Sequence, residues 1–334
     1  MSERDSAPFA PRGYEVLHRL GSGQTADVYL ADHRRYGRVA LKLPRPELAT
    51  QPVLRRMFEN EVMITLKLDH PRVVRALEGH PTGQGAFLAL EVCGGGTLDQ
   101  RLLERGRLPL SEAVRLVEDV AEGLAYTHDS KVLHRDVKPA NVFLDDEGRA
   151  KLGDFGTGVF VAEAAEDRVG TAFYMAPEIF EGATPSVRSD VYSLGVLAYE
   201  VLTGERPFGG DTVEALMHAH LGGLIRDPRS LRPKLAPDLS RAIRRAMARL
   251  PDRRYQRVAE FLEAVQAATP EVRPPAPTEA PARRVGRTGR TRAAAAPDTL
   301  EGEPPDRDGE GPAPTRGAWW RRLFGGDRDD DERS

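Results

Sequence analysis

Four polar residues could together hold a nucleotide and a metal ion: Lys42, Asp136, Asn141 and Asp154. Carboxylate and amide oxygens are ligands that Mg²⁺ prefers, and a lysine ammonium is a compact positive charge that can reach a phosphate. Lysine fills only 6 of the 48 basic positions of this chain, so a lysine at residue 42 is informative. Such a set suits phosphoryl transfer, which depends on positioning and charge neutralisation.

The segment at 134–141, HRDVKPAN, is the most specific stretch of the chain. It resembles the catalytic loop of Hanks-type (eukaryotic-like) serine/threonine protein kinases, whose pattern is His-Arg-Asp-x-Lys-Pro-x-Asn. The triplets DFG at 154–156 and APE at 176–178 follow in the order that the family has. The resemblance covers Tyr14 to Ala268, and it implies an enzyme that uses ATP and Mg²⁺, in a bacterial member of the family.

The resemblance implies a separate role for each polar residue of these motifs. Asp136 would accept the proton of the substrate hydroxyl and align its oxygen, and Lys138 would neutralise charge on the transferred group. Asn141 and Asp154 would ligate Mg²⁺. Two alternatives stay open at this point: a pseudokinase that binds nucleotide as a scaffold, and a small-molecule phosphotransferase.

The nucleotide phosphates are expected at a glycine-rich turn within Leu20 to Ala31. Gly21 and Gly23, with Ser22 between them, let backbone amides approach a phosphate without a Cβ in the way. Ala26 stands at the third glycine position of the family's pattern, which reduces backbone freedom there. Glu61, on a helix that follows, is expected to orient Lys42 toward the phosphates.

The adenine ring needs an apolar site with backbone partners at its edge. By position in the family, different residues should form the roof, the floor, the rear and the hinge of this site. The only cysteine of the chain falls in the hinge group and is read as a spacer rather than a reactive thiol. The roof would be Leu20, Val28 and Ala40, the floor Phe143, the rear Leu90, and the hinge the backbone of Glu91 and Cys93.

Further residues are expected to support the site or regulate it. His134 is read as a packed structural histidine, Asp190 as a brace for the catalytic loop, and Glu178 and Arg254 as a buried ion pair. The residue types at Thr171 and Lys138 resemble those of the serine/threonine branch of the family.

Arg135 usually receives an activation-loop phosphate in this family, yet residues 158–170 contain no Ser, Thr or Tyr. We therefore predict that the loop is ordered without phosphorylation, through Glu163, Glu166 or Asp167 or through a partner. Alternatively, these acids are solvated loop charges.

The hydrophobic periodicity predicts a strand-rich first lobe followed by a helical one. Strands are expected at 14–20, 26–32, 38–43, 73–78 and 87–92, with a helix at 53–68. Later helices are expected at 112–128, with Ser111 as its N-cap, and from Ser189 to a stop at Gly204. The fold class is therefore α+β. The resemblance implies a bilobal kinase domain at 14–269, between a flexible N-terminus at 1–13 and a C-terminal tail.

Composition bounds the partners and the setting. The formal charge of −3 gives no general attraction to nucleic acid, so none is expected as a partner. The expected partners are proteins with Ser or Thr acceptors, and a homodimer is also considered. With one cysteine and no apolar run of about 18 residues, the chain is expected to be cytoplasmic.

Residues 270–334 are rich in Pro, Ala and Arg and are predicted to be disordered. Their charges are segregated: arginines gather at 283–292 and acids at 298–310. A short patch at 319–324, with Trp319 and Trp320 beside Arg321 and Arg322, suggests a docking site for a protein or for peripheral association with a membrane. A patch without function is the alternative.

Overall fold

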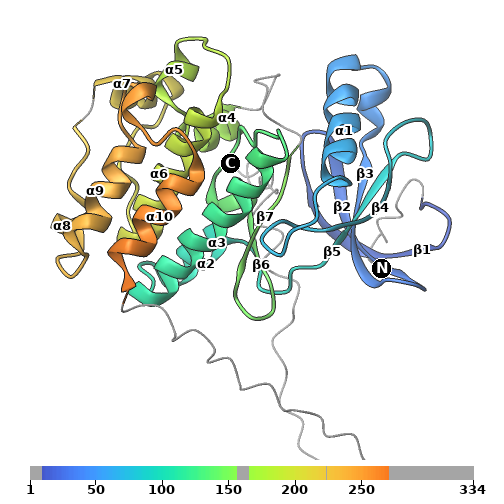
Figure 1. The fold of residues 1–334 in the computed structure, drawn as a ribbon. Coiled ribbons are helices and arrows are strands. Elements are labelled where there is room, and N and C mark those ends of the chain that lie inside the picture. The colour runs from blue at the N-terminus through green and yellow to red at the C-terminus, as the bar shows by residue number, and fades with distance from the viewer. Residues whose placement is uncertain (1–9, 156–164, 223, 271–334) are drawn as a thin grey trace, which may run out of the picture.

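The computed structural model describes residues 10–155, 165–222 and 224–270. These residues form two lobes, one built on a strand-rich sheet and one of packed helices (Figure 1). The expected α+β bilobal architecture is confirmed. The expected flexible N-terminus at 1–13 lies largely outside the described residues, and the expected disordered tail lies outside them from residue 271.

The first lobe is a five-stranded antiparallel sheet in the order β1-β2-β3-β5-β4. One helix, α1, packs against it, with a short 3-10 turn at Pro46–Ala49 before it. The elements are β1 (Tyr14–Ser22), β2 (Ala26–His33), β3 (Gly37–Pro44), α1 (Pro52–Thr65), β4 (Ala76–His80) and β5 (Phe87–Glu91).

Alternation along β3 separates the two faces of this sheet. Val39 and Leu41 are fully buried in a cluster on one face. Lys42 points to the opposite face, where Leu88 of β5 pairs with it and packs with Phe58 of α1. The alternating pattern thus delivers Lys42 to the side of the sheet that α1 covers.

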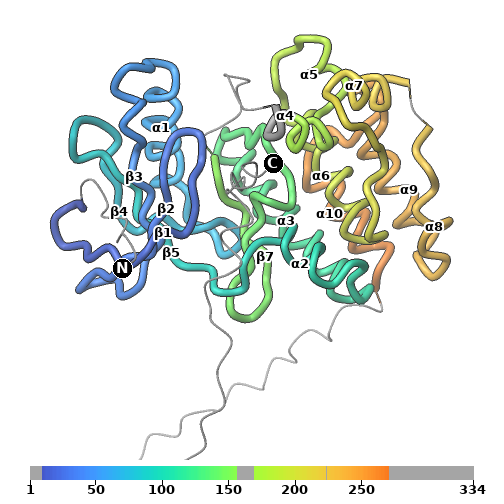
Figure 2. Tube along the Cα trace, turned by 180° about the vertical axis from the view of Figure 1, so that it is seen from behind, coloured from blue at the N-terminus to red at the C-terminus, as the bar shows by residue number. Residues whose placement is uncertain are grey.

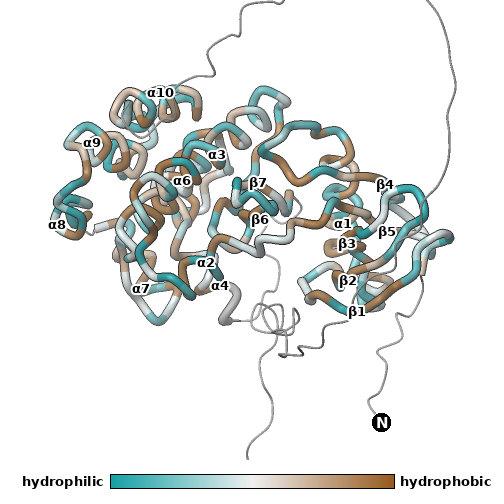
Figure 3. Tube along the Cα trace, turned by 90° about the horizontal axis from the view of Figure 1, so that it is seen from below, coloured by the Kyte–Doolittle hydropathy of each residue, from teal (hydrophilic) through white to brown (hydrophobic). Residues whose placement is uncertain are grey.

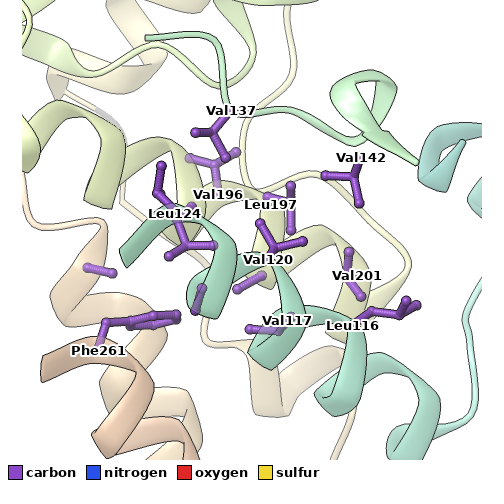
Figure 4. Close-up of a cluster of buried hydrophobic side chains, with 14 of the residues drawn as sticks. Leu116, Val117, Val120, Leu124, Val137, Val142, Val196, Leu197, Val201 and Phe261 are labelled. Carbon is purple, nitrogen blue, oxygen red and sulfur yellow. The ribbon is translucent and has the colours of Figure 1, made fainter. Parts of the chain in front are cut away.

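The second lobe is mostly helical and surrounds one large apolar cluster (Figure 4). Val120 and Leu124 of one helix contact Val196 and Leu197 of another, and all four are fully buried. The helices are α2 (Leu98–Arg105), α3 (Leu110–Asp129), α4 (Ala165–Ala172), α5 (Pro177–Phe180), α6 (Val187–Thr203), α7 (Val213–Gly222), α8 (Pro228–Leu231), α9 (Pro237–Ala246) and α10 (Val258–Ala268).

Helix boundaries differ from the predicted ones where capping decides them. α6 begins after Ser186, which forms a capping box with Ser189, so Ser189 lies inside the first turn. Gly204 ends α6 with φ 80°, as predicted, because glycine accepts the left-handed conformation. The prediction that Ser111 caps α3 was wrong, because Pro109 takes the N-cap position.

Residues 73–75 also depart from the prediction of a strand at 73–78. Val73 forms an isolated parallel bridge with Leu152, and the amide of Val74 donates to the carbonyl of Leu152 over 2.9 Å. β4 begins only at Ala76. The β-branched run is extended as predicted, but its first part pairs with the helical lobe instead of the sheet.

A two-stranded ribbon lies where the lobes meet, as the rear view shows (Figure 2). It consists of β6 (Val142–Leu144) and β7 (Ala150–Leu152), and β6 follows the 3-10 turn Pro139–Asn141. Apolar positions concentrate in the interior of both lobes (Figure 3). Within the described ranges, no helix has the length and apolar content needed to cross a membrane.

Candidate active site

Lys42 lies at the centre of a buried charge cluster. Its Nζ contacts Oε1 of Glu61 from α1 and Oδ1 of Asp154, which follows β7. Glu61 is 3% exposed, so its carboxylate has little water to compete for it. The sheet, the helix and the ribbon therefore bring three charges together at one point.

Burial and the neighbouring charges shift the pKa values of all three groups. Burial would lower the pKa of Lys42, but Asp154 and Glu61 together raise it above the ordinary value. Burial raises the pKa of Glu61. Burial would also raise the pKa of Asp154, but the ammonium of Lys42 outweighs it and the pKa is lowered. Asp154 is thereby held in the ionised form that a metal ligand requires.

The catalytic-loop motif folds into a compact polar arrangement. Asn141 Nδ2 donates to the backbone carbonyl of Asp136 over 2.8 Å and to its Oδ2 over 2.9 Å. Lys138 Nζ lies 2.9 Å from the same Oδ2 and donates to Thr171 Oγ1 over 2.8 Å. One ammonium therefore joins the carboxylate of Asp136 to a hydroxyl of the segment that precedes α5.

Asp190, in the first turn of α6, accepts hydrogen bonds from the backbone of this loop. Its Oδ2 accepts from the amide of His134 over 2.9 Å, and its Oδ1 accepts from the amide of Arg135 over 2.8 Å. Arg135 has φ 68°, a left-handed conformation that costs energy for a non-glycine residue. Two charge-assisted bonds to a residue that is 1% exposed hold the chain in that conformation.

His134 is fully buried and serves packing. Its ring lies 5.0 Å from the ring of Phe155, and its Nε2 bonds the carbonyl of Gly153 over 2.9 Å. Burial lowers the pKa of His134, so the ring is neutral and Nε2 acts as the donor.

The residues predicted for the adenine site gather around one face of the sheet. Strand register places Val28 opposite Lys42, and Leu90 opposite Ala40, so all four share a face. Leu20 of β1 is 6% exposed. Because Lys42 reaches Asp154 from this face, the face is directed at the helical lobe.

The predicted hinge and floor lie at the edge of the same face. The side chain of Glu91 contacts Lys151 over 2.7 Å, which links the hinge to β7. Phe143 of β6 pairs with Lys151 in the ribbon. Cys93 is buried, and burial raises the pKa of its thiol to about 12.

The glycine-rich turn joins β1 to β2. The amide of Gly23 donates to the carbonyl of Ala26 over 2.8 Å, and the hydroxyl of Ser22 bonds Asp27. Gly21 pairs with Val28. Ala26 is 1% exposed and its methyl group packs among apolar residues of α1, so the substituted position faces the core of the lobe.

The donor set fits a magnesium ion. Because Nδ2 of Asn141 is engaged with Asp136, its Oδ1 is the atom left for a cation. Asp154 supplies an ionised carboxylate. Within the described ranges, no cluster of three or more His, Cys, Asp or Glu forms a metal cage. Mg²⁺ commonly takes one or two carboxylates and keeps waters or phosphate oxygens as its other ligands, so such a cage is not needed.

Glu178 and Arg254 form an ion pair although they lie 76 positions apart in the sequence. Two guanidinium nitrogens of Arg254 donate to the two carboxylate oxygens, each over 2.7 Å. Arg254 is 1% exposed and also donates to the carbonyls of Arg188, Ala248 and Arg249. The pair ties α5 to the segment before α10.

Three residues outside the sequence motifs also contribute to the site and were not predicted. His128, at the end of α3, bonds Oδ2 of Asp190 over 2.7 Å, and Lys151 holds Glu91. A Cβ on Gly153 would lie 2.8 Å from Phe143, so only glycine fits there. For His128 and Lys151 no signal in the sequence specifies the partner. A glycine directly before DFG could have suggested close packing.

Some predicted features cannot be placed. Gly156, Glu163 and most of the 158–170 loop lie outside the described residues, and for Glu166 and Asp167 only the backbone of α4 is described. The side chain of Arg135 is exposed. The prediction that loop acids pair with Arg135 stays a prediction.

The comparisons with known proteins agree with this geometry. The model of the protein kinase domain matches residues 14–278. This chain belongs to the protein kinase family. Serine/threonine-protein kinase PknB of Mycolicibacterium smegmatis is 35% identical over 260 residues, which are 74% of this chain and 41% of that protein. Serine/threonine-protein kinase PknA of Mycobacterium tuberculosis is 33% identical over 291 residues, which are 84% of this chain and 67% of that protein.

These findings confirm the family that the motifs predicted, the Hanks-type serine/threonine kinases with bacterial relatives. The kinase match begins at Tyr14, where β1 begins, and runs ten residues past the end of α10. The chain spans about two fifths of the length of the PknB relatives that it matches.

Proposed function

We propose that this protein kinase transfers the γ-phosphoryl group of ATP to Ser or Thr hydroxyls of proteins, autophosphorylation included. The observation that carries the proposal is the position of Lys138, whose Nζ lies 2.9 Å from Asp136 Oδ2 and 2.8 Å from Thr171 Oγ1. A positive charge between the carboxylate and an acceptor-side hydroxyl marks the point where a substrate hydroxyl would meet a phosphate.

Each residue then has a defined task. Asp136, whose Oδ2 is engaged with Asn141 and Lys138, would accept the proton of the substrate hydroxyl on Oδ1. Lys138 would neutralise charge that develops on the transferred group. Thr171 would keep Lys138 in place and form part of the surface that receives the substrate.

The nucleotide side has its own residues. Lys42, oriented by Glu61, would hold the phosphates, while Gly21, Ser22 and Gly23 would cover them with backbone amides. Asn141 Oδ1 and Asp154 would hold Mg²⁺, which supplies charge neutralisation at the phosphates.

The adenine side depends on apolar contact. The ring would lie between the roof residues and Phe143, with Leu90 behind it and the backbone of Glu91 and Cys93 at its edge. Leu20, Val28 and Ala40 form that roof.

The partners we propose are proteins with Ser or Thr acceptors, in a signalling setting in the cytoplasm. We also propose a homodimer, and an association of the Trp-Arg patch with a protein or a membrane surface. Residues 319–324 of this patch lie outside the described residues.

Transfer of labelled phosphate from ATP to a generic basic protein tests the proposal. Asp136→Asn should lower the rate about 10² to 10⁴-fold, because the residue acts as base and aligner. The control is Asp145→Asn, since Asp145 lies on the turn between β6 and β7, where its Oδ1 accepts from the amides of Glu147 and Arg149. Nucleotide binding without transfer in the wild-type protein would instead identify a pseudokinase. Wild-type transfer by Asp136→Asn would overturn the assigned mechanism.

A further inference from the structure

A basic groove lies on the helical lobe at the end remote from the sheet, where Figure 1 shows α8 and α9. It is largely open to the surface and offers about 1070 Å³, at the upper limit of what small-molecule sites hold, so it has room for a peptide segment. Five arginines and one acid are the charged residues of its lining: Arg241, Arg244, Arg245, Arg249, Arg253 and Asp238.

The structure pairs only some of these arginines with carboxylates. Arg241 pairs with Asp238, and Arg244 lies 3.8 Å from Asp227 at the rim. Arg245 lies over the ring of Tyr255 at 4.2 Å, and no carboxylate of the described residues forms an ion pair with it. In the part of the chain that the structure describes, the exposed side chains of Arg249 and Arg253 form no ion pair. The groove therefore presents a net positive charge.

Apolar side chains accompany the arginines. Leu224 is 98% exposed and Leu250 is 52% exposed, and both line the groove with Ile225. Single exposed leucines are ordinary, but two at one basic groove add an apolar contact for a side chain of the ligand. The matching ligand is an acidic segment with an apolar residue among its acids.

The chain itself contains such a segment. Residues 298–310, DTLEGEPPDRDGE, hold six carboxylates and one arginine, with Leu300 between Asp298 and Glu301. The chain leaves the described structure just after α10, and Ala264 of α10 lines the groove. The 27 residues from 271 to 297 could extend to about 90 Å, so reach does not limit contact.

We propose that residues 298–310 of the tail bind this groove of the same chain. Leu300 would contact Leu224 and Leu250, and the carboxylates would pair with Arg249 and Arg253. Individual exposed ion pairs contribute little, but attachment in one chain gives an effective concentration on the order of 1 mM. A segment with a Kd of about 100 μM would then occupy the groove most of the time. Acidic segments of other proteins would have to compete with it.

The test uses the full chain and a fluorescent peptide of residues 296–312, with anisotropy read at low salt. A tail-neutral variant replaces Asp298, Asp306 and Asp308 by Asn and Glu301, Glu303 and Glu310 by Gln. This variant should bind the peptide about 10-fold more tightly than wild type, because its own segment no longer competes. Arg249→Glu with Arg253→Glu in the tail-neutral chain should abolish the gain.

Arg34→Glu with Arg38→Glu is the matched control, since both arginines are exposed on the other lobe, and it should leave peptide binding unchanged. Equal peptide affinity of wild type and the tail-neutral variant would overturn the proposal. It would also be overturned if the groove variant bound the peptide normally, or if the groove bound RNA or anionic vesicles in preference to the peptide. The readout is binding, so the result does not depend on whether the chain transfers phosphate.

Discussion

Lys42 is the residue on which the nucleotide side of the site depends. It is buried against two carboxylates, one from α1 and one from the segment after β7. The ammonium lowers the pKa of Asp154, while burial raises that of Glu61. The same contact therefore orients the lysine and keeps the proposed metal ligand ionised.

Glu61→Gln should lower kcat/KM for phosphate transfer about 10- to 100-fold, because a charge-assisted hydrogen bond worth about 1.5–3 kcal/mol is lost. Steady-state kinetics would measure this loss. Glu59→Gln on the same helix is the control, since the ion pair of Glu59 is with Arg55 on the helix surface, at 3.8 Å. Equal kinetics for the two variants would contradict the orienting role of Glu61.

Cys93 should react slowly with iodoacetamide at pH 8. Burial raises the pKa of its thiol to about 12, so far less thiolate is present than in an unfolded chain. Alkylation followed by mass spectrometry should be at least about 100-fold slower in the folded protein than in denaturant. Comparable rates would show that the hinge thiol is exposed and reactive.

At the scale of helices, α6 is the centre to which other elements attach. The guanidinium of Arg254 lies 4.7 Å from the centre of the ring of Tyr192, which is on α6. The hydroxyl of Tyr192 bonds Nδ1 of His220 on α7 over 2.6 Å. Through Arg254 the same region reaches Glu178 on α5. Tyr192 thus links α6 to α5, through Arg254 and Glu178, and to α7, through His220.

Arg254→Leu should destabilise the fold by about 3–5 kcal/mol, because it leaves the carboxylate of Glu178 without its partner. Urea denaturation would measure the change. Arg254→Leu with Glu178→Leu should recover part of the loss. The control, Arg257→Leu, removes a surface pair and should cost about 0–1 kcal/mol. A small effect for Arg254→Leu alone would show that the pair is not structural.

Acid should weaken the attachment of α7. Burial lowers the pKa of His220 from about 6.5 to about 4, so the unfolded state binds the extra proton between these values. Stability contributed by neutral His220 is present above about pH 6.5 and declines as pH falls toward 4.

Between pH 7 and pH 5 this histidine should cost the wild type at most about 2 kcal/mol of unfolding free energy. Buried His134 adds a loss of its own, so the measurement is the difference between wild type and His220→Gln in urea denaturation at each pH. His220→Gln should show a shallower decline with acid. Equal declines of the unfolding free energy with acid in wild type and His220→Gln would contradict the assigned role of His220.

At the scale of the whole molecule, the described site is built entirely between β1 and α10. The two lobes are joined by the bond from Val74 to Leu152 and by the pair of Glu91 and Lys151. None of these contacts involves the tail, so catalysis should not need it.

Deletion of residues 271–334 should therefore leave transfer to a generic substrate intact. A second truncation after residue 278, where the kinase match ends, controls for the choice of boundary. Kinetics and thermal unfolding of both truncations should match the full chain. Loss of activity in both would show that the tail is part of the catalytic unit.

The sequence by itself determined the residue types of the site, the order of its motifs and the kinds of elements that hold them. These features are local, because alternation, capping and motif spacing depend on neighbours along the chain. Lys42 on an alternating strand and Gly204 at a helix end could be predicted for that reason.

Only the tertiary structure decided which distant residues meet. Lys42 contacts Asp154 across 112 positions, and Lys138 contacts Thr171 across 33. Val73 and Val74 pair with Leu152 of β7 instead of the sheet, and His128 bonds Asp190. Such contacts depend on how helices and sheet pack around the shared apolar cores, and no local pattern contains that packing.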